Sequence, residues 1–237
     1  VDTGMGLERA NCILQGKTSV YLTEVFQPII NTIEKLSNYT YGTDEEKDKS
    51  VRIIADHSRS SVFILGDQKG VTPDRVGAGY VLRRLIRRAV RHGMKLGIEE
   101  SFLAKIALSV VENFCCAYPE LSDNKEKIDN RLTKEEEKFR QNLKKGEAEF
   151  KKLLPNLMKN PKKEISGKVA FRLYDTFGFP LELTEELGAE NGFTVDKEGF
   201  KEAERKHQEA SKSADAGAAK GGLAEQNDTT ISYHTAT

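Results

Sequence analysis

The sequence predicts a mainly α-helical fold, and two observations support that prediction. Apolar residues recur at three- and four-residue spacing through most of the 237-residue chain, as on one face of a helix. Glycine, proline and aspartate gather in separate stretches between these segments, as in residues 66–78, which is typical of loops. No internal repeat is visible. We therefore expect a succession of helices packed around a common core.

Composition limits the possible function classes. The chain has 37 basic and 37 acidic residues, so any contact with RNA must be local. No apolar run reaches membrane-spanning length, and there is no signal segment, so we expect no membrane partner. The cysteines Cys12, Cys115 and Cys116 lack zinc spacing and favour a reducing, cytoplasmic location. The chain begins with valine inside what looks like a motif, which suggests an excised fragment.

The first half predicts three helices before the most basic segment. The first helix covers Leu7–Gln15. The second covers Ser19–Ser37, with a possible kink at Pro28. The third covers Val51–Leu65 and is separated from the second by a polar loop, Tyr39–Ser50. Its apolar residues, and those of the second helix, repeat at helical spacing: Leu22, Phe26, Ile29, Ile30, Ile33, Leu36, Val51, Ile54, Val62 and Leu65.

The second half continues with helices and ends in a polar segment. Thr133-Lys-Glu-Glu136 predicts a capping box that opens a long charged helix to about Leu154. Its apolar positions form a narrow seam for packing on another helix: Leu132, Phe139, Leu143, Phe150 and Leu154. The remaining expected segments are a helix at Phe102–Phe114, a turn at Tyr118–Asn124, a loop at Pro155–Gly167, helices at Gly167–Tyr174, Pro180–Glu190 and Asp196–Lys212, and a flexible linker at Ser211–Asp228.

The segment Gly79–Gly93 carries the densest positive charge. On a helix, Leu82, Leu85, Ile86, Ala89 and Val90 share one face, and the opposite face carries Arg83, Arg84, Arg87, Arg88 and Arg91. Guanidinium groups suit phosphate, so a polyanion such as nucleic acid is the leading partner. The alternative is a solvated face whose arginines pair with acidic neighbours, and some of the five are expected to do so.

Four strings, in order, resemble the alanyl-tRNA synthetase family of class II aminoacyl-tRNA synthetases. The first, Val1-Asp-Thr-Gly-Met-Gly-Leu-Glu-Arg9, is similar to motif 3; taken alone, its two close glycines are only a weak signal for an anion site. The others are Arg52-Ile-Ile-Ala-Asp-His-Ser-Arg59, the basic segment Gly79–Gly93, and Ala170-Phe-Arg-Leu-Tyr-Asp-Thr-Phe-Gly-Phe-Pro180. The resemblance covers essentially the whole chain.

The resemblance implies roles in ATP-dependent alanine activation for the motif 3 residues. Arg9 matches the arginine that contacts ATP phosphates, with Gly6 beside it, and its charge would offset charge that develops as pyrophosphate leaves. Asp2 matches the residue that binds the alanine ammonium, and Gly4 lies beside the small side-chain pocket. ATP and Mg²⁺ would serve the parent enzyme. An ordinary turn and a surface salt bridge of Arg9 are the structural alternatives.

The resemblance also implies recognition of the tRNA(Ala) acceptor stem, with no role for DNA. Asp175 matches the aspartate that reads the G·U wobble pair, although it could instead cap the helix near Thr176–Phe177. The other family reader is an Asn, but this chain has Arg75 there, so we expect Asp74 to assist. The basic helix would grip phosphates without reading sequence. His57 is expected to be structural.

These resemblances divide the chain into three expected regions. They are the end of a class II antiparallel catalytic domain (a strand and helix, residues 1–16), a helical tRNA-recognition domain (17–212), and a linker with the start of an editing domain (213–237). His234 matches one zinc ligand of that editing domain, and a lone histidine predicts no metal here. We expect the fragment alone to be inactive. The alternatives are a stand-alone, non-catalytic RNA-binding helical module and a helical scaffold.

Overall fold

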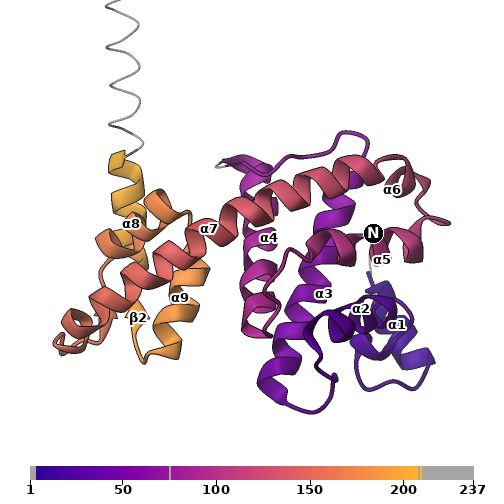
Figure 1. The fold of residues 1–237 in the computed structure, drawn as a ribbon, viewed down its shortest axis with the longest axis horizontal. Helices are drawn as coiled ribbons and strands as arrows, with labels where there is room; N and C mark the ends of the chain where they lie inside the picture. Colours follow the sequence, from indigo (N-terminus) through magenta and orange to yellow (C-terminus); the bar gives the residue numbers. More distant parts are fainter. Residues whose placement is uncertain (1–3, 75, 208, 210–237) are drawn as a thin grey trace, which may run out of the picture. The chain divides into compact units, whose positions relative to one another are not determined.

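The computed structural model describes residues 4–74, 76–207 and 209, and most of them are helical, as predicted (Figure 1). None of the described helices is long and apolar enough to cross a membrane. The elements are α1 (Leu7–Leu14), a 3₁₀ turn (Val20–Leu22), α2 (Gln27–Ser37), α3 (Glu45–Gly66), α4 (Gly77–Lys95), α5 (Leu103–Phe114), α6 (Pro119–Asp123), α7 (Lys125–Met158), β1 (Glu164–Ile165), α8 (Gly167–Phe177), α9 (Leu181–Glu190) and β2 (Thr194–Val195).

The chain divides into two compact units. Unit 1 comprises Val1–Lys152 together with Phe177–Pro180, and unit 2 comprises Leu153–Thr176 and Leu181–Thr237. In unit 1, α3 packs along α4 and also contacts α2 and α5. Most residues of the predicted apolar stripes form its core: Ile29, Ile30, Ile33, Val51, Ile54, Val62, Leu65, Leu82, Ile86, Ala89 and Val90 are all at most 1% exposed. Three other stripe residues are not buried, since Leu22 is 37% exposed and Leu36 and Leu85 are half-buried. The helical periodicity therefore identified the buried faces of α2, α3 and α4 correctly.

The predicted second helix is wrong over its first eight residues. Residues 20–22 form a 3₁₀ turn, opened by Ser19, whose hydroxyl accepts a hydrogen bond from the Tyr21 amide at 3.3 Å. Helix α2 starts only at Gln27, with Pro28 in its first turn. A proline there loses no intrahelical hydrogen bond, so Pro28 starts the helix and does not kink it.

The predicted loop before α3 is too long. Asp44 caps α3 by accepting a hydrogen bond from the Lys47 amide at 3.0 Å, so the helix begins at Glu45, six residues earlier than predicted. The residues that follow this cap are mostly charged, so the sequence pattern predicted a loop where the first turns of α3 lie. The loop preceding α4 ends close to its predicted boundary, since α4 begins at Gly77.

The predicted capping box at Thr133 is wrong. Helix α7 begins at Lys125, so Thr133 lies within it. Glu136 is fully buried and accepts hydrogen bonds from the amides of Phe102 and Leu103, at 3.1 and 2.9 Å, at the start of α5. It therefore caps another helix. The apolar seam is confirmed for Leu132, Phe139, Leu143 and Phe150, all buried.

Two further boundaries differ from the prediction. Pro155 lies inside α7, which continues to Met158, and the predicted turn near residue 120 contains the short helix α6. Helix α8 extends through Asp175 to Phe177 and is followed by Gly178, which has a φ of 68°. Such a backbone favours glycine and ends the helix there, three residues later than predicted.

Unit 2 contains two short strands that the sequence did not predict. Strands β1 and β2 are parallel, with Glu164 opposite Thr194 and Ile165 opposite Val195. Two residues are too few for an alternating pattern to be visible. Helix α8 packs on the helix at 197–207 through aromatic side chains: the Phe171 and Phe200 rings lie 6.0 Å apart, and those of Tyr174 and Phe200 lie 5.6 Å apart.

Candidate functional site

The five arginines of α4 do not share one solvent face. Arg87 and Arg91 are 1% and 3% exposed, whereas Arg83, Arg84 and Arg88 are partly exposed. The prediction of a five-arginine outer face is therefore wrong for Arg87 and Arg91. Because α4 packs against α3 on one side and contacts α7 through Arg87, too little of its surface faces solvent to expose all five arginine side chains.

Arg87 is bound by protein groups. Its guanidinium pairs with Glu135 of α7 at 2.6 Å, donates to the Gly178 carbonyl and lies 5.0 Å from the centre of the Phe139 ring. Arg83 also approaches Glu135, at 3.6 Å. The expectation that some arginines pair with a glutamate-bearing helix is therefore confirmed. Arg87 joins α4, α7 and the loop after α8, all within unit 1.

Arg84 and Arg88 lie on the more accessible part of α4. The Arg84 guanidinium lies 6.0 Å from the centre of the Tyr80 ring. Arg88 Nη1 lies 3.2 Å from His57 Nε2. Because an arginine can only donate, Nε2 accepts and the ring proton resides on Nδ1.

A carboxylate of α3 completes this contact. His57 Nδ1 lies 2.9 Å from Asp56 Oδ2, and this hydrogen bond is the main reason that the pKa of Asp56 is below its ordinary value. Both ring nitrogens of His57 are thus engaged with neighbouring side chains. This arrangement agrees with the structural role that the sequence suggested for His57.

The loop before α4 is pressed against the helix at Gly79. The Asp74 amide donates to the Gly79 carbonyl at 3.1 Å. A Cβ at Gly79 would come within 2.5 Å of the Thr72 carbonyl oxygen and 2.7 Å of Asp74 Cβ. Gly79 therefore has to lack a side chain for this loop to lie where it does. Asp74 is exposed, and Arg75 lies outside the described residues.

The glycine-rich start is partly described. Asp2 lies outside the described residues, Gly4 is exposed, and no strand is assigned at residues 4–6. Arg9 is exposed and forms no ion pair with any residue that the structure describes, so the surface salt bridge considered for it has no described partner. A Cβ at Gly6 would lie 3.1 Å from Arg9 Nε, so the Arg9 side chain folds back over this glycine.

Glu8 ties α1 to α3. Its carboxylate is 2.5 Å from Arg59 Nη2, and this hydrogen bond is the main cause of its lowered pKa. The Arg59 guanidinium carbon lies 5.1, 5.3 and 6.0 Å from the ring centres of Phe26, Phe114 and Phe63. The sequence reasoning missed this arrangement, because its residues are far apart in the chain.

Asp175 lies in the last turn of α8, with a side chain 40% exposed. A residue inside the last turn cannot cap the N-terminus of its own helix, so the predicted capping role is wrong. The His207 ring lies close to it, with Nε2 at 3.9 Å from the carboxylate. The carboxylate is therefore available on the surface of unit 2. His234 lies outside the described residues.

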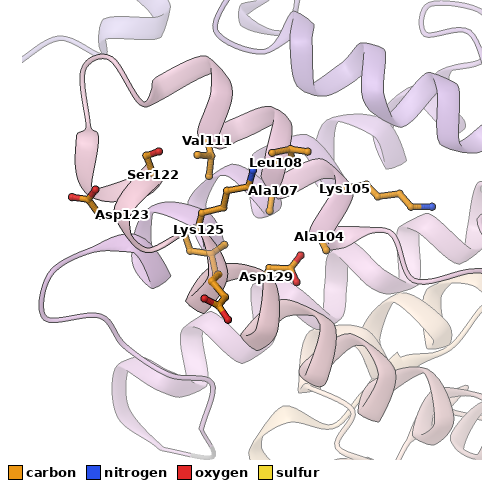
Figure 2. A pocket seen from close by; sticks show the side chains of 11 residues that line it. Ala104, Lys105, Ala107, Leu108, Val111, Ser122, Asp123, Lys125 and Asp129 are labelled. Carbon is orange, nitrogen blue, oxygen red and sulfur yellow. The ribbon is translucent and has the colours of Figure 1, made fainter.

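A cavity of about 530 Å³ lies among α5, α6 and the start of α7. Figure 2 shows apolar side chains of α5, such as Leu108 and Val111, with polar side chains of the two other helices, such as Asp123 and Asp129. None of the predicted site residues lines it. The cavity therefore does not coincide with the candidate site.

Comparison with known proteins finds one matching family and several similar relatives. Residues 1–237 match the family model described as tRNA synthetases class II (A). The chain is 57% identical over its whole length to the alanine–tRNA ligase of Treponema denticola and 51% identical to that of Treponema pallidum, covering 40% and 39% of those proteins. It is 48% identical to the alanine–tRNA ligase of Anaeromyxobacter sp. (strain Fw109-5), over 84% of this chain and 24% of that protein. The chain thus spans about two fifths of the length of the two Treponema proteins.

Proposed function

Because the chain belongs to the class II tRNA synthetase (A) family, we propose that it is a segment of an alanine–tRNA ligase. In this proposal, the segment binds the acceptor stem of tRNA(Ala) and contributes motif 3 to ATP-dependent alanine activation. The observation that carries the proposal is the match along the entire chain to proteins of that name at about half identity. Residues 1–16 would end the catalytic domain, 17–212 would recognise tRNA, and 213–237 would lead into an editing domain.

The surface of α1 supports a role as part of a larger domain. Four apolar side chains around it are 77–86% exposed among the described residues: Met5, Leu7, Ile13 and Leu14. Apolar side chains gathered on one short segment and exposed to this extent usually pack against another surface. In the proposed enzyme, that surface would be the remainder of the catalytic domain.

Motif 3 would supply the positive charge for the activation step. Arg9 would contact the ATP phosphates beside Gly6, where only hydrogen occupies the side-chain position. Asp2 would bind the alanine ammonium, and Gly4 would leave room for its methyl group. The neighbouring acid Glu8 is engaged by Arg59, so nothing favours it as a ligand of the Mg²⁺ that accompanies ATP.

Binding of tRNA would combine phosphate contacts with readers of bases. Arg83, Arg84 and Arg88 on α4 would grip the phosphates of the acceptor stem. The loop before α4 would bring Arg75, assisted by Asp74, to the wobble pair. Arg87 and Arg91 are left out because they are buried. Asp175 would accept a hydrogen bond from the exposed guanine amino group of the G·U pair.

The test measures binding of this chain to acceptor-stem hairpins that carry G·U or G·C at the recognition pair. Asp175→Ala is expected to weaken binding to the G·U stem by about 1–3 kcal/mol and to leave the G·C stem unchanged. Arg84→Met should weaken both stems alike and reduce the salt slope by about one. Glu137→Gln, at an exposed position of α7, is the matched control. Equal losses on both stems for Asp175→Ala would contradict its reading role.

A second candidate is an independent RNA-binding helical module without catalysis. It is favoured by the same partly exposed arginines, because phosphate binding alone requires no catalytic domain. Alanine-dependent pyrophosphate exchange separates the two proposals. The synthetase proposal expects exchange by the full-length protein that contains this chain and none by residues 1–237 alone. A full-length protein that binds the stem but lacks exchange would favour the independent module.

A further inference from the structure

We propose that Arg59 is a positioning residue for alanine activation, which sets the orientation of α1, and thus of Arg9, through its ion pair with Glu8. The inference rests on the proposed function, because Arg9 acts on ATP only if the chain belongs to an alanine–tRNA ligase. It concerns residues of α3 and α1 that would not themselves contact the substrates.

Helix α1 has little apolar packing to hold it in place. It is eight residues long, and Cys12 is its only buried residue. Gly6, at its N-cap, provides no side-chain cap. Within the described part of the chain, the polar contacts of α1 are at two places. In its second half, Asn11 donates to Glu24 at 2.7 Å and the Cys12 thiol donates to the Lys17 carbonyl at 3.2 Å, and in its first turn Glu8 pairs with Arg59.

The pair between Glu8 and Arg59 is the contact next to Arg9 in the chain. A change in the direction of the first turn therefore moves Arg9, while the contact of Asn11 would hold only the other end. Loss of the ion pair would leave this turn with no side-chain cap and with no hydrogen bond or ion pair to α3 among the described residues. Small displacements of a group that contacts the reacting phosphates have large kinetic effects.

Arg59 is itself held rigidly. Its guanidinium lies against the rings of Phe26, Phe63 and Phe114, which come from the start of α2, from α3 and from α5. The Phe63 and Phe114 rings also contact each other edge to face, with centres 5.2 Å apart. The cation faces one carboxylate and three aromatic rings, so few other orientations are open to it. The core of unit 1 is thereby connected directly to the turn that carries Arg9.

The contact with Arg59 favours the ionised form of Glu8, which the ion pair requires. The hydrogen bond from Arg59 is the largest cause of the lowered pKa of Glu8, and nearby Asp56 opposes it. The ion pair thus persists at neutral pH. It is partly screened by solvent, since the Glu8 and Arg59 side chains are 32% and 24% exposed, so its effect on overall stability should be small.

The test uses the full-length synthetase that contains this chain and measures alanine-dependent pyrophosphate exchange. Arg59→Met is expected to raise the KM for ATP about 10- to 100-fold, with the KM for alanine and the Kd for the acceptor stem within about twofold of wild type. Glu8→Gln leaves the aromatic rings untouched and should give a similar increase. The double variant should be no worse than the more affected single variant, because both changes remove one contact.

Arg52→Met provides the control, since Arg52 lies on α3 and pairs with the exposed Glu45 at 2.7 Å. It should leave every kinetic constant within about twofold of wild type. A KM for ATP unchanged in both Arg59→Met and Glu8→Gln would overturn the inference, even if the melting temperature fell. Additive effects in the double variant would do the same. Absence of exchange by the wild-type synthetase would instead refute the proposed function.

Discussion

Replacing Glu136 by glutamine should destabilise unit 1 substantially. Glu136 is fully buried and accepts hydrogen bonds from the Phe102 and Leu103 amides and from Arg140 Nε, the last at 2.9 Å. Glutamine has the same shape, but one of its two terminal groups is a donor. At least one of these three donors would therefore face an NH₂ group and lose its partner.

The expected cost follows from these contacts. Removing one partner of a buried ion pair typically costs about 3–5 kcal/mol. Two effects reduce the cost here. Glutamine keeps one acceptor. In addition, the buried carboxylate is itself costly to desolvate, as the raised pKa of Glu136 shows. We expect the free energy of unfolding to fall by about 2–4 kcal/mol.

The assay is urea unfolding followed by far-ultraviolet circular dichroism, since the chain contains no tryptophan. Hydrogen exchange of the Phe102 and Leu103 amides provides a local readout, and both should exchange faster in Glu136→Gln. Glu137→Gln, one residue further along α7 and exposed, should change stability by less than about 0.5 kcal/mol. If Glu136→Gln matched this control, the proposed capping of α5 by α7 would not contribute to stability.

Three other substitutions test separate features. Gly79→Ala should cost about 1–3 kcal/mol and weaken acceptor-stem binding, because the new methyl group meets the Thr72 carbonyl; binding at the wild-type level would contradict the role of this loop. Asp56→Asn should flatten the loss of stability on acidification from about pH 5 to 3. The lowered pKa of Asp56 stabilises the native chain above the ordinary value of 3.8, and this contribution disappears as the pH falls. Parallel curves of stability against pH for wild type and variant would refute this reasoning. Arg87→Met should lower the melting temperature without changing the salt dependence of RNA binding, since Arg87 pairs with Glu135; a smaller salt slope would show that it contacts phosphate.

The fold was largely predictable from local patterns, and the errors lie at helix ends. The stripes on α2, α3 and α4 coincide with the buried core because a helix repeats every 3.6 residues whatever it packs against. Helix starts were less predictable, as the region near Thr133 shows. A threonine followed three residues later by glutamate has the same spacing inside a helix as at its start, so the motif could not identify the N-terminus.

The candidate site was predicted in part. The basic helix and the loop before it were identified from charge and resemblance, and the structure places Asp74 directly against Gly79 of that helix. Asp175 is exposed, as a reader of RNA would need to be. The contacts around Arg59 were not predicted, because they join side chains from four separate segments of the chain.

The sequence by itself determined the helical class, the buried faces of the main helices and the family to which the chain belongs. The helical class and the buried faces depend on residue spacing along one segment, and the family resemblance rests on four motif strings, so none of them requires knowledge of how the helices pack. Only the tertiary structure decided that Arg87 is buried against Glu135, that Glu136 caps α5, and that Arg59 holds Glu8. Each of these pairs joins residues 33–51 positions apart, and local spacing does not specify which helices meet.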